Sequence, residues 1–119
     1  MSDESVLRDV LDAWKSAVDA HDPDRVATLF TADAIFQGVH PYGVGPAAVA
    51  AYYAPQPIGL TAAYDLRETR HLSDDLILGY AAVEFTFTER PPVRGFLGVL
   101  VRRAGDTWRI AHYQFSRPA

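Results

Sequence analysis

The final segment of the chain, GDTWRIAHYQFS at residues 105–116, carries side chains that could bind or transform a small molecule. A Gly-Asp turn signal is followed by β-branched and aromatic residues, which predict a strand over 107–116. His112 and Gln114 then share one face of that strand, because side chains alternate between faces. An imidazole ionises near neutral pH and suits general acid–base catalysis. A carboxamide can donate and accept hydrogen bonds at the same time.

Both faces of this predicted strand carry apolar side chains. The face of His112 and Gln114 also carries Trp108 and Ile110, and the opposite face carries Tyr113 with Phe115. A sheet with one solvated face would show a cleaner split into apolar and polar positions. We therefore expect both faces to be covered, one of them ending in hydrogen-bonding groups.

Glu84 is a carboxylate in the middle of another predicted strand, within the segment YAAVEFTF. Its face also carries Tyr80, whereas the alternating positions are uniformly apolar. Two possibilities follow from this pattern. Glu84 is either an acid inside a ligand pocket or a charge on the outer face of the sheet, at a subunit seam.

Composition excludes several classes of protein. The 119 residues are 49% hydrophobic with a formal net charge of −4, which is typical of a globular protein and argues against nucleic-acid binding. There is no cysteine, no histidine pair with metal-ligand spacing and no phosphate-binding or dinucleotide loop, so we expect no metal and no cofactor. The acidic N-terminus and the lack of a long apolar run predict a cytoplasmic protein without a membrane partner.

The elements that position these residues follow from periodicity. A first helix, capped by Asp3 or Ser5, carries an apolar stripe that includes Trp14. A second short helix begins at Pro23 after an Asp22 cap, and a third covers 47–53. Strands are expected at 34–38, 62–71, 76–88, 93–103 and 107–116. Helices first and a long antiparallel meander last indicate one α+β domain over 1–119.

The order of these elements and several phrases resemble a known family. HDPDRVATLFTADAIFQG, YGVGPAAVAAYY and VRRAGDTWRIAHYQFS resemble the SnoaL-like group of the nuclear transport factor 2-like superfamily, closest to the SgcJ/EcaC type. The resemblance covers essentially the whole chain. It implies a cystatin-like cone, in which a strongly curved antiparallel sheet and three N-terminal helices enclose an apolar pocket. It also implies a homodimer through the convex face of the sheet, which would cover Tyr113 and Phe115.

Within that cone we expect Trp108, Ile110, His112 and Gln114 to face the pocket, with Trp108 buried against the first helix. His112 and Glu84 are the candidate catalytic residues. The candidate ligand-binding residues are Gln114, Tyr42, Tyr52, Trp14, Phe36 and Trp108. For the tyrosines, which the cone places near its mouth, packing is the alternative role.

Two functions remain open at this point. One is the binding of a small hydrophobic, oxygenated molecule, with a role in secondary metabolism. The other is a cofactor-independent lyase or isomerase, such as a polyketide cyclase or a ketosteroid isomerase-like enzyme, with His112 as acid and base. They differ in whether a titratable group faces the pocket beside a hydrogen-bonding partner.

Overall fold

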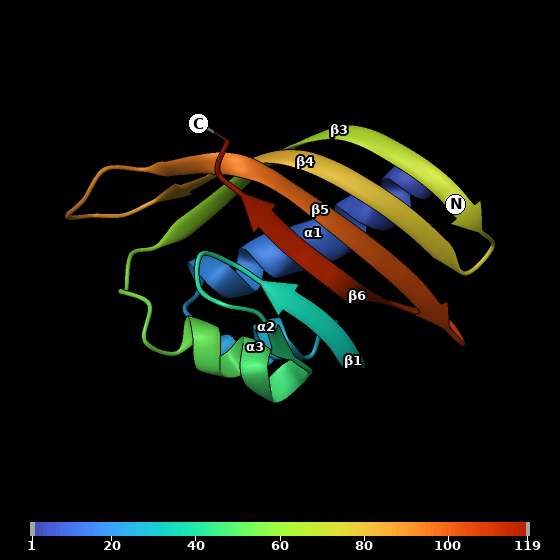
Figure 1. The fold of residues 1–119 in the computed structure, drawn as a ribbon, viewed down its shortest axis with the longest axis horizontal. Helices are drawn as coiled ribbons and strands as arrows, with labels where there is room; N and C mark the ends of the chain where they lie inside the picture. Colours follow the sequence, from blue (N-terminus) through green and yellow to red (C-terminus); the bar gives the residue numbers. More distant parts are fainter. Residues whose placement is uncertain (1, 119) are drawn as a thin grey trace.

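A six-stranded sheet curves over three helices in the computed structural model, which describes residues 2–118 (Figure 1). The helices are α1 (Asp3–Asp19), α2 (Pro23–Ala27) and α3 (Pro46–Tyr53). The strands are β1 (Phe30–Gln37), β2 (Gly43–Val44), β3 (Thr61–Ser73), β4 (Leu76–Thr86), β5 (Val93–Ala104) and β6 (Thr107–Ser116). The predicted α+β class, with a curved sheet and N-terminal helices, is confirmed.

The strand order is β2-β1-β6-β5-β4-β3, so the first long strand lies beside the last one. β1 and β6 run parallel, and every other neighbouring pair is antiparallel. We call the side of the sheet that faces the helices the concave face and the other side the convex face. Most of the apolar core lies between the concave face and α1.

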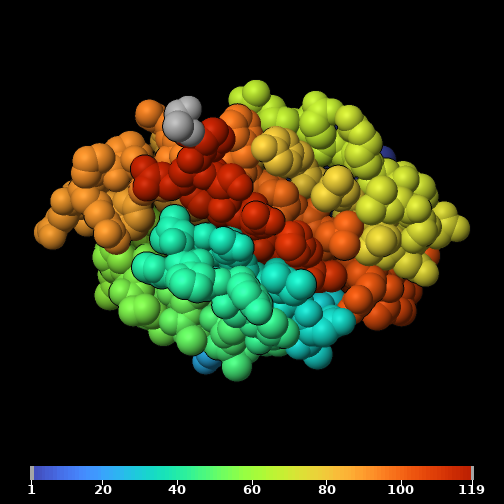
Figure 2. All heavy atoms as spheres, viewed as in Figure 1, coloured from blue at the N-terminus to red at the C-terminus, as the bar shows by residue number. Residues whose placement is uncertain are grey.

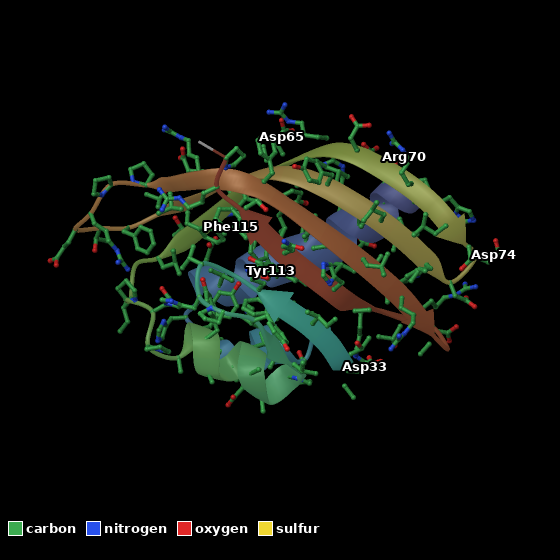
Figure 3. The ribbon with its side chains drawn as sticks, viewed as in Figure 1. Asp33, Asp65, Arg70, Asp74, Tyr113 and Phe115 are labelled. Carbon is green, nitrogen blue, oxygen red and sulfur yellow. The ribbon has the colours of Figure 1, made fainter. Side chains whose placement is uncertain are left out.

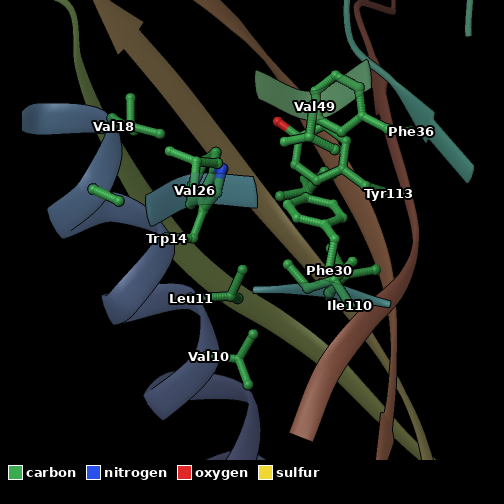
Figure 4. Packing of buried hydrophobic residues seen from close by; sticks show 14 of the residues in the cluster. Val10, Leu11, Trp14, Val18, Val26, Phe30, Phe36, Val49, Ile110 and Tyr113 are labelled. Atoms are coloured by element: carbon green, nitrogen blue, oxygen red, sulfur yellow. The ribbon is translucent and has the colours of Figure 1, made fainter. Parts of the chain in front are cut away.

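Helix α1 packs through the stripe that its sequence predicts. Its buried residues are Val6, Leu7, Val10, Leu11, Trp14, Ala17 and Val18, and Figure 4 shows this side of the helix turned toward the strands. The N-terminal cap is Ser2, whose side chain accepts a hydrogen bond from the Ser5 amide at 3.1 Å, in place of the predicted Asp3 or Ser5. Gly79 of β4 lets the helix approach, because a Cβ there would lie 2.8 Å from Leu7. None of the helices within residues 2–118 is long and apolar enough to cross a membrane.

The boundaries of the later elements follow the predictions with two exceptions. The Asp22 cap and Pro23 start of α2 are confirmed. β1 begins at Phe30, earlier than predicted, and the two-residue strand β2 was not predicted at all. β2 forms because Val44 pairs with Ile35 across a loop that brings Gly43 and Val44 back along β1.

A one-residue irregularity in β6 changes which side chains face the core. Val101 of β5 pairs with Ile110, but Leu100, which precedes Val101 in β5, pairs with His112. Ala111 is therefore an extra residue, a β-bulge, and side-chain alternation is reset after it. Ile110 is buried on the concave face, and beyond the bulge Tyr113 and Phe115 are buried there too, at 1% and 6% exposure.

The two tryptophans differ in burial. Trp14 is fully enclosed, whereas Trp108 is only half-buried and lies with the Arg103 guanidinium 5.6 Å from its ring centre. Trp108 packs against the edge of the core and is not the central residue that the alternation predicted.

This difference predicts unequal costs of truncation. Trp14→Ala should lower the free energy of unfolding by about 3–5 kcal/mol, because it empties a fully buried site. Trp108→Ala should cost less, since part of its apolar surface is already in water. Chemical denaturation of both variants measures this difference, and equal losses would contradict the assigned burial.

Candidate functional site

A cavity of about 440 Å³ opens at the end of the sheet where β6 and the β4–β5 loop lie. Its inner wall consists of buried and half-buried side chains, namely Tyr52, Tyr53, Gln56, Leu60, Phe85, Phe87 and Val93. Its open side, which we call the mouth, is lined by exposed residues: Val39, His40, Pro55, Pro57, Arg90 and Arg117. The inside of the cavity is thus mainly apolar, and the charged groups lie where it meets solvent.

Helix α3 supplies two adjacent tyrosines to this cavity. The helix starts at Pro46 after Gly45, whose φ of 84° ends the preceding strand in a conformation that suits glycine. At its other end Tyr52 accepts a hydrogen bond from the Val39 amide at 3.1 Å. Its ring packs directly on Gly38, where a Cβ would lie 2.3 Å from the hydroxyl oxygen. This contact fixes the loop after β1 against α3 and holds one wall of the cavity in place.

The second tyrosine joins a buried chain of polar groups. The Trp14 indole N–H donates to the Tyr53 hydroxyl at 3.2 Å, and the Tyr53 and Tyr113 hydroxyl oxygens lie 3.4 Å apart. These three residues come from α1, α3 and β6. Tyr113 also stacks on Phe36 with ring centres 4.5 Å apart, as the close-up in Figure 4 shows. Tyr53 is the member of this chain that reaches the cavity wall.

Burial keeps these phenols neutral. Desolvation raises the pKa of Tyr53 and of Tyr113 well above the usual tyrosine value, and it raises the pKa of Tyr52 as well. The phenols therefore act as hydrogen-bond donors and acceptors at physiological pH, and not as proton-abstracting bases. A neutral donor of this kind suits a carbonyl, ether or hydroxyl oxygen.

The bulge at Ala111 places His112 and Gln114 on the convex face, so the prediction that they face the pocket is wrong. His112 lies beside Leu100 and Ile35, and Gln114 lies beside Gly98 and Gln37, all on the convex side of the sheet. In the same way Tyr113 and Phe115, labelled on β6 in Figure 3, belong to the core of the chain and not to its outer surface.

Glu84 also lies on the convex face, which decides between its two possibilities. Its β4 neighbours Val83 and Phe85 point to the concave side, and Glu84 forms an ion pair with Arg94 of β5. A carboxylate already paired with an arginine, and turned away from the cavity, cannot act on a ligand held there.

The remaining candidates fall in four different environments. Tyr52 lines the cavity, and its role in ligand binding stays a prediction. Trp14 and Phe36 are buried behind the wall, where Trp14 packs edge-on against Phe85 with ring centres 5.9 Å apart. Tyr42 is 65% exposed in the loop before β2, and it does not line the cavity. Trp108 lies at the start of β6, whereas the cavity lies past the end of that strand.

The sequence analysis missed most of the inner wall. Phe85, Phe87 and Val93 flank the turn between β4 and β5, and Leu60 ends the segment that follows α3. Their apolar alternation predicted strands but gave no sign that the ends of these strands enclose a cavity. The two mouth arginines were not singled out, because an arginine in a loop or after a final strand is usually solvated.

The sequence itself matches one family model. Residues 7–119 match the model described as the SnoaL-like domain, which is almost the whole chain. The chain belongs to the SnoaL-like domain family. The finer SgcJ/EcaC assignment stays a prediction. No protein with a curated description matches this SnoaL-like chain significantly.

Solved structures resemble the SnoaL-like chain in fold. A protein of unknown function with a cystatin-like fold from Nostoc punctiforme is 16% identical, with a TM-score of 0.84 over 98% of this chain and 78% of that one. A ketosteroid isomerase-like protein from Erwinia carotovora atroseptica is 24% identical, with a TM-score of 0.82 over 97% and 95%. An NTF-2 like protein of unknown function from Shewanella oneidensis is 16% identical, with a TM-score of 0.82 over 95% and 98%. At these identities the likeness shows the fold alone.

The hydrogen bonds among Trp14, Tyr53 and Tyr113 predict different effects of removing the Tyr53 and the Tyr113 hydroxyl groups. Tyr53→Phe leaves the Trp14 N–H without its acceptor and should cost about 1–3 kcal/mol of unfolding free energy. Tyr113→Phe removes only the long contact of 3.4 Å and should cost less than about 1 kcal/mol. Thermal or chemical unfolding measures both, and a larger loss for Tyr113→Phe would show that the network is arranged differently.

Proposed function

We propose that this SnoaL-like domain binds a small hydrophobic molecule that carries a neutral oxygen acceptor. The observation that supports it is the mainly apolar cavity with the buried, neutral Tyr53 in its wall. A cavity of this size and character is typical of small-molecule sites, where a few polar groups orient an otherwise apolar ligand.

Binding is favoured over catalysis by the groups that face the cavity. An isomerase or lyase needs a group that accepts a proton from its substrate. Among the described residues that line the cavity there is no aspartate or glutamate, and His40 at the mouth is the one imidazole. His112 and Glu84, on which the catalytic alternative relied, lie on the convex face. The isomerase-like name of the Erwinia protein therefore has no counterpart in a proton-accepting carboxylate here.

Tyr53 is the residue that we expect to orient the ligand. Either hydroxyl of the Tyr53–Tyr113 pair can donate. When Tyr113 donates, the Tyr53 oxygen accepts from both Tyr113 and Trp14, and its own proton is available to the cavity. A hydroxyl that accepts hydrogen bonds is polarised and becomes a stronger donor. Tyr53 would then hold a ligand oxygen at the inner end of the cavity.

Displacement of a fluorescent reporter tests this proposal. N-phenyl-1-naphthylamine is neutral and apolar, and its emission should rise on binding to the cavity. Methyl 2-naphthoate, which carries a carbonyl, should displace it at about fivefold lower concentration than 2-ethylnaphthalene, which has no oxygen, because one hydrogen bond contributes about 1 kcal/mol. Tyr53→Phe should remove that advantage without changing displacement by 2-ethylnaphthalene.

A cavity-filling variant shows where the reporter binds. Val93→Trp places a large side chain in the cavity wall, and it should abolish reporter binding while its circular dichroism stays that of the parent. Reporter binding that survives Val93→Trp, or a carbonyl advantage that survives Tyr53→Phe, would overturn the assigned site.

We further propose a homodimer through the convex face. Figure 2 views this face, where β1, β6, β5 and β4 form the surface and α1 is almost entirely hidden behind them. Ile35, Leu78 and Tyr80 are exposed there by 45%, 38% and 42%, and Tyr80 stacks on Phe96 with ring centres 5.5 Å apart. These exposed apolar side chains favour burial against a second copy. Tyr113 and Phe115 take no part, since they are buried in the core.

Charge substitutions on this face test the dimer. Leu78→Arg should convert a dimer into a monomer, because two copies of the new charge would meet in or near an apolar interface. Leu72→Arg is the matched control, since Leu72 is an exposed leucine near the end of β3. Sedimentation equilibrium at micromolar concentration measures both, and a parent protein that is monomeric there would contradict the proposal.

A further inference from the structure

The positive charges of the chain are not evenly paired. Eight of the eleven lysine and arginine side chains form ion pairs with carboxylates of the described residues. Arg109 donates instead to the Thr28 carbonyl at 3.3 Å. The two that remain are Arg90 and Arg117, and both line the mouth of the cavity. In a chain with a net charge of −4, two of the three cations without a carboxylate partner in residues 2–118 thus lie at one place.

Arg90 is held at the mouth by an aromatic ring. Its guanidinium carbon lies 4.0 Å from the centre of the Phe87 ring, and Phe87 itself lines the cavity. A cation over a ring face is attracted by the ring's negative potential, and the contact leaves the planar edge of the guanidinium free to donate hydrogen bonds. Glu89 precedes Arg90 in the chain and lines a neighbouring hollow, yet it does not form an ion pair with Arg90.

Arg117 approaches the mouth from a different part of the sheet. It follows Ser116, the last residue of β6, and comes two residues after Phe115. The Phe115 ring packs against Phe85 of the cavity wall with ring centres 5.2 Å apart. The carboxylates of the described residues include none that lines this cavity. Two guanidinium groups that form no ion pair within residues 2–118 therefore face the same opening, above an apolar interior.

We infer that the ligand of this cavity is an amphipathic organic anion, a hydrophobic carboxylate whose charged group binds Arg90 and Arg117 at the mouth. This inference rests on the proposed binding function and specifies the class of its ligand. The guanidinium fork matches the two oxygens of a carboxylate, and charge-assisted hydrogen bonds are stronger than neutral ones. The hydrocarbon part would lie against the inner wall, and the neutral oxygen acceptor would reach Tyr53.

The same displacement assay separates charge from shape. 2-Naphthoate and its methyl ester share a ring system and a carbonyl, and they differ in charge. At low ionic strength 2-naphthoate should displace N-phenyl-1-naphthylamine at about fivefold lower concentration than the ester, and added salt should reduce this advantage. Arg90→Gln and Arg117→Gln should each reduce it, and the double variant should abolish it. Arg70→Gln is the control, since Arg70 lies toward the far end of β3 (Figure 3).

The outcomes distinguish this inference from the binding proposal beneath it. If the ester displaces the reporter and 2-naphthoate has no advantage, the ligand is not an anion, and the binding proposal stands. The inference is also overturned if 2-naphthoate keeps its advantage over the ester in the double arginine variant. The same holds if Arg70→Gln removes that advantage as fully as the double variant does. If neither compound displaces the reporter, both proposals fail together. Tyr53→Phe should not remove the salt-sensitive advantage of 2-naphthoate, because Tyr53 is buried in the wall and is not part of the mouth. It should enlarge that advantage, since the ester alone loses its hydrogen bond to Tyr53.

Discussion

The unpaired residue Ala111 in β6 is the constraint on which the rest of the structure depends. Because of it, β6 presents both Ile110 and Tyr113 to the core, although three positions separate them and strict alternation would place them on opposite faces. Tyr113 can then stack on Phe36 and reach Tyr53. Without the extra residue the second half of the strand would turn its histidine and glutamine into the core and its aromatic rings outward.

The Trp14, Tyr53 and Tyr113 chain shows what this geometry makes possible. A helix at the start of the chain, a helix near its middle and the final strand each contribute one polar group to an otherwise apolar interior. Buried polar groups must find partners, because leaving one unpaired costs the desolvation that it has already undergone. These hydrogen-bonded side chains therefore hold the three elements together. Tyr53, the one of the three that lines the cavity, is positioned by Trp14 and Tyr113.

The convex face and the mouth of the cavity differ in how their charges are paired. The convex face mixes apolar side chains with charged ones, and its carboxylate Glu84 forms an ion pair with Arg94. The mouth carries Arg90 and Arg117 without such partners in the described chain. A surface that pairs its charges is suited to burial against another copy, whereas a surface that leaves like charges together is suited to an oppositely charged ligand.

The sequence by itself determined the α+β class, the buried stripe of α1, the Asp22 and Pro23 start of α2 and the SnoaL-like resemblance. These features are encoded in short-range periodicity and turn chemistry, which a single sequence displays. Tertiary structure was needed to place His112 and Tyr113, because a bulge is a mismatch between two strands and leaves no mark in either one alone. It was also needed to place Glu84, because alternation along a strand does not say which of its faces meets the helices. The cavity was likewise decided by tertiary structure, since its wall joins residues from Val39 to Arg117 that become neighbours only when the curved sheet and α3 meet.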